Sequence, residues 1–395
     1  MRGRTNISGG ITLNATVGNF LVASGNNITG GDFVEYILNS GTTVSLDAKF
    51  GSGCFLIDET SHTYLGIIGL YPTLFTYVSG TITIVSQLSV DATQIDKLDA
   101  THFVAFNSSS ELQANKVFTF SATSTTLTKI NETTFTGYGT ISAVASKVFV
   151  IVGASEMKSY LCDSSFNISN VSTFSLNTGS LLGVTSNAVV VKTYSSSYYY
   201  IYVYPINATT GVITNTSGRL SRSENDFGVG FAGYKAINDR YIPIIGNDTY
   251  VNLVDVNENV LRGMGKVTTN NSTIRKTSPV NANNEFVLLS IYNSVCSYFA
   301  VKIDTTTMSI AVEDTITDNM SASVFYVSLL TDNQFVAFVN DIGYKNVYLY
   351  SGNVEFGSPS NVVQQWSGND NPMGVAKQSG SAGETIEVYI PQVSN

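Results

Sequence analysis

The sequence predicts an all-β protein, a seven-bladed β-propeller inserted into a small β domain formed by both termini. Three observations lead to this prediction. The 395 residues include 33 Gly, 22 Tyr and 21 Phe but 7 Pro, and 12% are charged, a composition typical of strands and turns. A short segment repeats seven times at nearly constant spacing. Finally, two segments at opposite ends of the chain resemble each other.

The repeat consists of an apolar residue, a polar turn and a short apolar run, and residues 98–106 (LDATHFVAF) are its clearest copy. Other copies lie at 144–150, 184–191, 237–244, 280–289 and 330–338, and a weaker first copy begins at 53–57. We align the copies on seven anchor residues, spaced 40 to 53 residues apart: Phe55, Phe103, Val148, Ala188, Tyr241, Phe286 and Phe335. Four-stranded propeller blades repeat at about 40 to 50 residues.

Each unit continues with alternating runs separated by Gly, Asn or Asp turns, as in residues 201–214 and 299–310, which predicts β-hairpins. A stack of β-sandwiches would also contain regular short strands, but the nearly constant unit length favours a propeller. The first copy is degenerate, and the interval between Ala188 and Tyr241 leaves room for an insertion. The sequence therefore predicts the number of blades to within one.

The matching terminal segments are residues 22–37 and 375–390, and each contains Val-Ala, a turn with Ser-Gly, then Gly, an acidic residue and an alternating strand. Two such pieces at opposite ends predict one domain whose middle holds a long insertion. We therefore expect residues 1–50 plus 367–395 to form a small β docking domain and residues 51–366 to form the propeller. Trp366, at the junction, is expected to be a packing anchor.

The segment Gly374-Val375-Ala376, continued by residues 379–388 (SGSAGETIEV), resembles the closing segment of small β domains in tailed-bacteriophage virion proteins. Residues 31–35 (GDFVE) are similar to the opening segment of the same domains. These virion proteins include tail-associated adhesins and head-decoration proteins. The resemblance implies a virion location and docking to other virion proteins through the terminal β domain. It implies no catalytic residue.

Charge and hydropathy restrict the partners. A net charge of −9 and a pI near 4.7 argue against binding nucleic acid, because such surfaces need Lys and Arg against phosphates. The most apolar window, residues 64–78, is too short for a membrane span and contains Pro72. The N-terminus shows no apolar signal core, so we expect assembly in a host cytoplasm.

The sequence shows no catalytic or metal-binding pattern, so we expect neither an enzyme nor a cofactor. Cys54, Cys162 and Cys296 are widely spaced, and the two His have no ligand companions at short spacing, so we interpret the cysteines as buried thiols. Glycosidases generally use two carboxylates. The available aspartates all have turn contexts, and we expect them to be solvated: Asp226, Asp239, Asp255, Asp304 and Asp332.

The candidate ligand-binding residues are aromatic and basic. Tyr198, Tyr200 and Tyr202 alternate along one strand face, where rings could stack on sugars while their hydroxyls form hydrogen bonds. Packing between blades is the alternative for these rings. Arg219 and Arg222 lie in a predicted loop rich in Ser and Asn and could bind an anionic glycan, the alternative being a solvated loop.

The functional hypothesis is a phage virion protein, present in multiple copies, that docks through its terminal domain and presents a propeller to a host-surface glycan or envelope. One alternative is a capsid decoration protein without receptor binding. A glycan-degrading propeller is the other alternative. Fold alone does not separate these functions.

Overall fold

The computed structural model forms two compact units, Met1–Asn39 with Gly357–Asn395, and Ser40–Phe356. It describes residues 15–22, 27–30, 32–36, 42–46, 53–78, 81–108, 114–214, 219–223, 229–230, 236–245, 250–267, 274–278, 280–281, 283–292, 295–318, 322–329, 334–341, 347–353, 362–365, 374–376, 378–381 and 385–391. Every regular element among these residues is a strand. None of them forms a helix that is long and apolar enough to cross a membrane.

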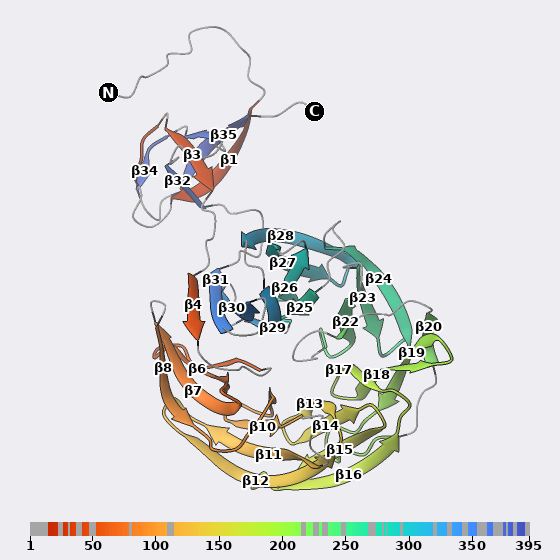
Figure 1. Cartoon of the computed structure of the whole chain (residues 1–395). Coiled ribbons are helices and arrows are strands. Elements are labelled where there is room, and N and C mark those ends of the chain that lie inside the picture. Colours follow the sequence, from red (N-terminus) through yellow and green to blue (C-terminus); the bar gives the residue numbers. More distant parts are fainter. Residues whose placement is uncertain are drawn as a thin grey trace. The chain divides into compact units, whose positions relative to one another are not determined.

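The central unit is a β-propeller of seven four-stranded antiparallel sheets, which confirms the predicted fold class (Figure 1). Blades 1 to 4 each use four consecutive strands: β5 (Phe55–Asp58), β6 (Thr63–Ile68), β7 (Tyr71–Val78) and β8 (Thr81–Gln87); β9 (Gln94–Lys97), β10 (His102–Phe106), β11 (Ala114–Ala122) and β12 (Leu127–Thr136); β13 (Gly139–Ala145), β14 (Val148–Gly153), β15 (Glu156–Cys162) and β16 (Ile168–Ser175); β17 (Ser180–Val184), β18 (Ala188–Ser195), β19 (Tyr198–Pro205) and β20 (Arg219–Ser223).

Blades 5 and 6 follow the same plan, and blade 7 takes its fourth strand from the N-terminal side of the chain. Their strands are β21 (Val229–Gly230), β22 (Tyr241–Ile245), β23 (Tyr250–Asp255) and β24 (Val260–Lys266); β25 (Ile274–Thr277), β26 (Glu285–Tyr292), β27 (Val295–Asp304) and β28 (Ser309–Asp318); β29 (Ala322–Leu329), β30 (Gln334–Asp341), β31 (Val347–Asn353) and β4 (Thr42–Leu46). First strands lie innermost and fourth strands outermost (Figure 1).

Strand β4 closes the propeller by pairing antiparallel with β31, from Thr42 opposite Ser351 to Leu46 opposite Val347. This pairing changes the domain boundaries. The sequence placed residues up to 50 in the terminal domain, but β4 belongs to the central unit, which begins at Ser40 and ends at Phe356. No local pattern marks β4 as a blade strand, because its partner lies about 300 residues later.

The propeller cores lie between neighbouring blades. Phe103 packs with residues of blades 1 and 2, and Phe286 with residues of blades 5 and 6; both side chains are fully buried. They lie on second strands, as do Val148, Ala188 and Tyr241. Phe335 lies on β30, also a second strand, but its side chain is outside the described residues. These positions confirm six of the seven anchors.

The first anchor is wrong. Phe55 lies on β5, the innermost strand of blade 1, whereas the other anchors lie on second strands. The second strand of this blade is β6, where Tyr64 and Leu65 are buried. Its turn, residues 58–62 (DETSH), is long and starts from a strand that is only half-buried. The apolar residues of β5 were therefore mistaken for the buried second strand.

A second recurring feature is the turn between third and fourth strands. Asp163, Asn207, Asp255 and Asp304 each begin such a turn, and in each case the side-chain Oδ1 accepts hydrogen bonds from two backbone amides further along the turn. Short polar side chains form such Asx turns readily. The propeller thus repeats a turn chemistry as well as a strand pattern.

The terminal unit contains a closed barrel with the strand order β1 (Ala15–Val22), β32 (Val362–Gln365), β3 (Phe33–Tyr36), β33 (Gly374–Ala376) and β35 (Thr385–Pro391). Its longest pairing joins β1 to β35, from Ala15 opposite Pro391 to Leu21 opposite Thr385. A small sheet joins β2 (Asn27–Ile28) to β34 (Gly380–Ser381). Both chain ends therefore build one domain, as the matching terminal segments predicted. Trp366 lies outside the described residues.

Candidate functional site

The turns that follow the innermost strands of blades 2 to 5 surround a pocket of about 200 Å³, here called the inner-turn pocket. Lys97 ends β9, Ser146 follows β13, Ser186 follows β17, and Asp239 lies in the turn before β22. Because innermost strands of successive blades are neighbours around the propeller axis, turns from distant parts of the sequence meet at this end. The lining also includes the apolar residues Leu98, Val144 and Val184.

The pocket carries an acidic side chain that blade 4 holds in place. The backbone N of Ser186 donates to Asp239 Oδ1 at 2.6 Å, and the Ser186 hydroxyl donates to Asp239 Oδ2. A carboxylate has acceptor sites for about four hydrogen bonds. Asp239 is exposed and lines the pocket, so its carboxylate can accept further hydrogen bonds beside those from Ser186.

The turn that carries Asp239 has an unusual backbone. Asn238 and Asp239 both have φ of 52°, in the left-handed region, which Asn and Asp enter more readily than other non-glycine residues. The backbone N–H groups of Arg240 and Tyr241 both donate to Ile237 O at 3.0 Å and close the turn. Residues in such conformations persist only where the surroundings hold them.

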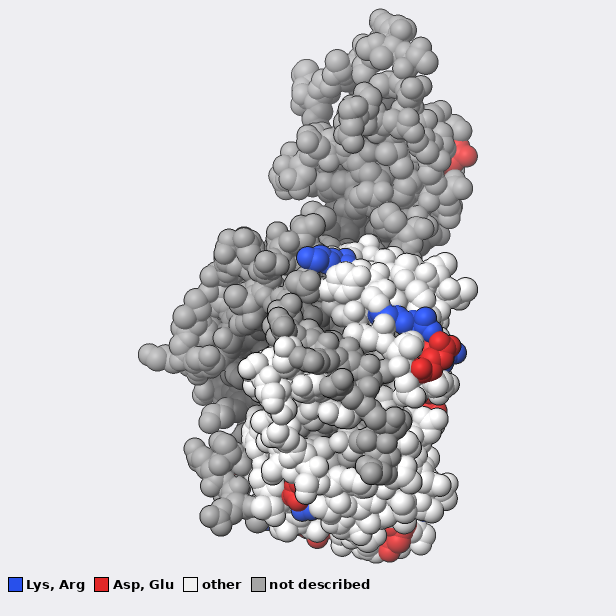
Figure 2. Space-filling model, turned by 90° about the vertical axis from the view of Figure 1, so that its right-hand side faces the viewer, with Lys and Arg blue, Asp and Glu red and all other residues white. Residues whose placement is uncertain are grey.

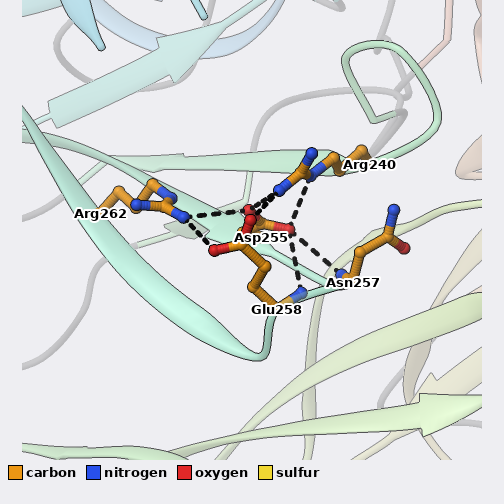
Figure 3. A network of polar contacts seen from close by, with 5 residues as sticks. All are labelled: Arg240, Asp255, Asn257, Glu258 and Arg262. Carbon is orange, nitrogen blue, oxygen red and sulfur yellow. Dashed lines mark hydrogen bonds and ion pairs between the residues drawn. The ribbon is translucent and has the colours of Figure 1, made fainter.

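The network beside the pocket anchors this turn (Figure 3). Arg240 donates from Nε to Asp255 Oδ1 at 2.9 Å and from Nη2 to Asp255 Oδ2 at 2.6 Å. Arg262 contacts Asp255 Oδ2 at 3.5 Å, and both arginines also pair with Glu258. The Arg240 guanidinium lies 4.8 Å from the ring centroid of Tyr241. Arg240 directly follows Asp239, so the ion pair with Asp255 restrains the pocket turn.

The Asp255 carboxylate differs from the sequence-based expectation, which treated it as a solvated turn residue. Its side chain is completely buried. Burial opposes ionisation, but the hydrogen bonds from Arg240 and from the Glu258 amide hold the pKa of Asp255 below its usual value. Asp304 and Asp239 are exposed, as expected. Asp226 and Asp332 lie outside the described residues.

The predicted tyrosines lie along the third strand of blade 4. Ring centroids of Tyr198, Tyr200, Tyr202 and Tyr204 follow one another at 6.4 to 6.5 Å. Tyr202 and Tyr204 pack against the core between blades 3 and 4, and Tyr204 lies 6.1 Å from the Phe174 ring centroid. The first three tyrosines are half-buried. Among the three predicted tyrosines, Tyr202 therefore packs between blades, whereas the described ring contacts of Tyr198 and Tyr200 lie along their own strand.

The predicted arginines lie in strand β20 and not in a loop, which corrects the expectation for this segment. The backbone register places Arg222 opposite Tyr200 and Arg219 opposite Tyr202, with an irregularity between these pairs. The side chains of both arginines are outside the described residues. All five predicted site residues thus lie on two paired strands, the third and fourth of blade 4, whereas blade 4 contributes to the inner-turn pocket through the turn after its first strand.

The cysteine interpretation is confirmed for two of the three residues. Cys54 and Cys162 are buried free thiols, and burial raises the pKa of each thiol to about 12. The side chain of Cys296 is outside the described residues. Within the described part of the chain, no three His, Cys, Asp or Glu side chains gather as a metal-binding group.

The pocket residues Lys97 and Ser186 were not among the predicted site residues, although the repeat pattern contains a signal for them. Residues 98–106 and 237–244 were recognised as equivalent repeat units, and the turn at the start of each unit follows an innermost strand. Polar residues in these turns therefore lie at one end of the propeller. Lys97 directly precedes the clearest repeat copy.

Comparisons with known proteins support the propeller fold. A chain described as "Structure of U3-55K" has 11% identity and a TM-score of 0.50, and the match covers 78% of this chain and 98% of that one. A chain of "Crystal Structure of Mitotic Checkpoint Complex" has 9% identity and a TM-score of 0.50, covering 78% of this chain and 92% of that one. No protein-family model and no curated protein matches.

Proposed function

We propose that the protein is a bacteriophage virion component that attaches through its terminal β domain and presents the propeller as a binding module for the host surface. The observation that carries this proposal is the pairing of the two segments on which the virion resemblance rests. Phe33 lies opposite Val375 and Val34 opposite Gly374, and the backbone N of Gly30 donates to Ser379 Oγ at 2.9 Å.

The connections between the units support a role in presentation. In the terminal unit, β3 and β32 are paired neighbours, with Tyr36 opposite Val363. In the propeller, β4 and β31 are paired neighbours as well. The chain connects the two units twice, from β3 to β4 and from β31 to β32. In each unit the two connected strands pair with each other, so each unit completes its own sheet structure. An attachment domain and a binding domain can therefore coexist in one chain.

In this proposal the protein binds its ligand without changing it. The described lining of the inner-turn pocket contains one carboxylate, that of Asp239, whereas hydrolysis of a glycosidic bond generally uses two. The described surface in the space-filling view is mostly uncharged, with few charged groups (Figure 2). Such a surface favours recognition by hydrogen bonds and ring contacts, and several copies on one particle would add avidity.

The test combines location and binding. Particles are purified, the protein is identified on them by mass spectrometry, and antibody labelling in the electron microscope locates it. The purified full-length chain is then incubated with host cells and isolated envelope polysaccharides, followed by pull-down and product analysis. We expect a tail location and binding without released oligosaccharide. A capsid location without host binding would favour the decoration role, released product would favour an enzyme, and absence from the particle would reject the proposal.

A further inference from the structure

The inner-turn pocket is small. Its volume of about 200 Å³ lies below the range of about 300 to 1,000 Å³ that is typical of drug-sized ligands. A single sugar unit or a molecule of similar size fits these dimensions. The turns of four blades line the pocket, which is open to solvent on one side.

The polar groups of the pocket differ in charge and in the number of hydrogen bonds that they can still form. Lys97 is half-buried, lines the pocket and has no side-chain hydrogen bond or ion pair with the described residues. The ammonium of Lys97 can donate three hydrogen bonds. Asp239 offers the acceptor sites left by Ser186. The pocket thus presents an ammonium that pairs with no side chain among the described residues, and a carboxylate that can accept from hydroxyl groups.

The structure also holds the acceptor in place before any ligand arrives. Ser186 contacts both carboxylate oxygens of Asp239, and the next residue, Arg240, pairs with the buried Asp255. Preorganised polar groups bind more tightly because less ordering is required on association. The left-handed backbone at Asp239 is consistent with a position held for binding.

We propose that the inner-turn pocket binds an acidic sugar unit, with the ligand carboxylate at Lys97, ligand hydroxyls donating to Asp239, and a C–H face against Val144. This inference rests on the proposed function and names its ligand class. Pairing between an ammonium and a carboxylate supplies the charge-assisted contact. The small volume suits a single unit.

The test measures binding of monosaccharides to the full-length chain by saturation-transfer NMR and calorimetry. The probes are sodium glucuronate, galacturonate and N-acetylneuraminate, with glucose as the uncharged comparison and alanine as a zwitterion. We expect at least one acidic sugar to bind about tenfold more tightly than glucose. Lys97→Met should remove this preference, and Asp239→Asn should weaken binding of the acidic sugar about tenfold.

Two variants serve as matched controls. Lys129→Met removes a lysine that pairs with Glu132 on the outer strand of blade 2, and Asp58→Asn changes the aspartate of the corresponding turn in blade 1, where it accepts from Thr60 and Ser61. Neither should change sugar binding. If Asp239→Asn disturbs folding, as judged by thermal unfolding, Lys97→Met remains decisive because the ammonium makes no hydrogen bond or ion pair with the described residues.

The outcomes separate this inference from the proposed function. Lack of binding by all three acidic sugars, a preference unaffected by Lys97→Met, or stronger binding of alanine would overturn the pocket assignment. If Lys97→Met loses acidic sugar binding but the wild-type chain binds no host polysaccharide, the pocket stands and adhesion fails. If Lys97→Met still binds host polysaccharide as the wild-type chain does, adhesion stands and the pocket is not its site.

Discussion

Asp255 in blade 5 and Asp304 in blade 6 begin equivalent turns, yet their surroundings differ. Each accepts from two backbone amides through Oδ1. Asp304 is exposed, and its second oxygen accepts from the Thr307 hydroxyl at 2.7 Å. Asp255 is buried, and its second oxygen accepts from Arg240. The repeat sets the turn, and the neighbouring side chains decide whether the same aspartate is a solvated cap or the centre of an ion-pair network.

The largest difference in stability should appear when the carboxylates of Asp255 and Asp304 are removed one at a time. Asp255→Ala removes a buried carboxylate that accepts from Arg240 and from two backbone amides, and leaving such groups without their acceptor typically costs about 1 to 3 kcal/mol, although both arginines keep Glu258 as a partner. Asp304→Ala removes solvated hydrogen bonds only. We expect the Asp304 loss to be less than about a third of the Asp255 loss, measured by urea denaturation. Equal losses would show that the cap, and not the network, determines the stability.

The next difference concerns pH. The folded-state pKa of Asp255 lies below its unfolded value, so its stabilising contribution is complete above the unfolded pKa of about 3.9 and is lost as pH falls through the folded value. The stability advantage of wild type over Asp255→Asn should therefore be constant near neutral pH and shrink below about pH 4. Urea titrations between pH 3 and 7 check this. An advantage that grows on acidification would contradict the assigned sign.

Replacing Arg240 or Arg262 should give a smaller difference in stability. Arg240 contacts both oxygens of Asp255, at 2.9 and 2.6 Å, whereas Arg262 contacts one at 3.5 Å. We therefore expect Arg240→Met to lower the urea midpoint more than Arg262→Met. The double mutants with Asp255→Asn provide the coupling of each pair. Similar couplings would mean that Glu258, which pairs with both arginines, holds the network together.

The smallest effect should be seen at the pocket. Arg240 acts on Asp239 only through the backbone of the turn, so Arg240→Met should weaken acidic sugar binding by less than Asp239→Asn does, while Arg262→Met should leave binding unchanged. Calorimetry with the acidic sugar that binds best compares the three variants. A loss with Arg262→Met equal to that with Arg240→Met would show that the whole blade, and not the turn, shapes the pocket.

The same comparison explains what the sequence could and could not predict. The strands and the second-strand anchors were predictable, because Phe103 and Phe286 occupy the same place in units with a local pattern. The burial of Asp255 was not, because its local sequence resembles that of Asp304, and the arginines that cover it belong to a preceding turn and a following strand. Strand β4 was missed because pairing across nearly the whole chain leaves no local signal.

The candidate site shows the same limit. Sequence identified the tyrosines and arginines of blade 4 by residue type, and the pairing of β19 with β20 brought them together. It did not identify the inner-turn pocket, because Lys97, Ser186 and Asp239 lie in different blades. Only the circular arrangement of the blades makes these turns neighbours. A site whose residues come from different blades can be identified only when the blades are placed in space.

The pairing of the chain ends has a consequence for synthesis on the ribosome. Blades 1 to 6 use consecutive strands, so each can form as its residues emerge, and domains generally fold in order of synthesis. Strand β4 emerges early but must wait for β31, and β1 must wait for β35, whose last residue is Pro391. A nascent chain therefore carries β4 and β1 without these partners until β31 and β35 have been synthesised. A ribosome that stops early would release a propeller without its closing strand pair and with no terminal barrel.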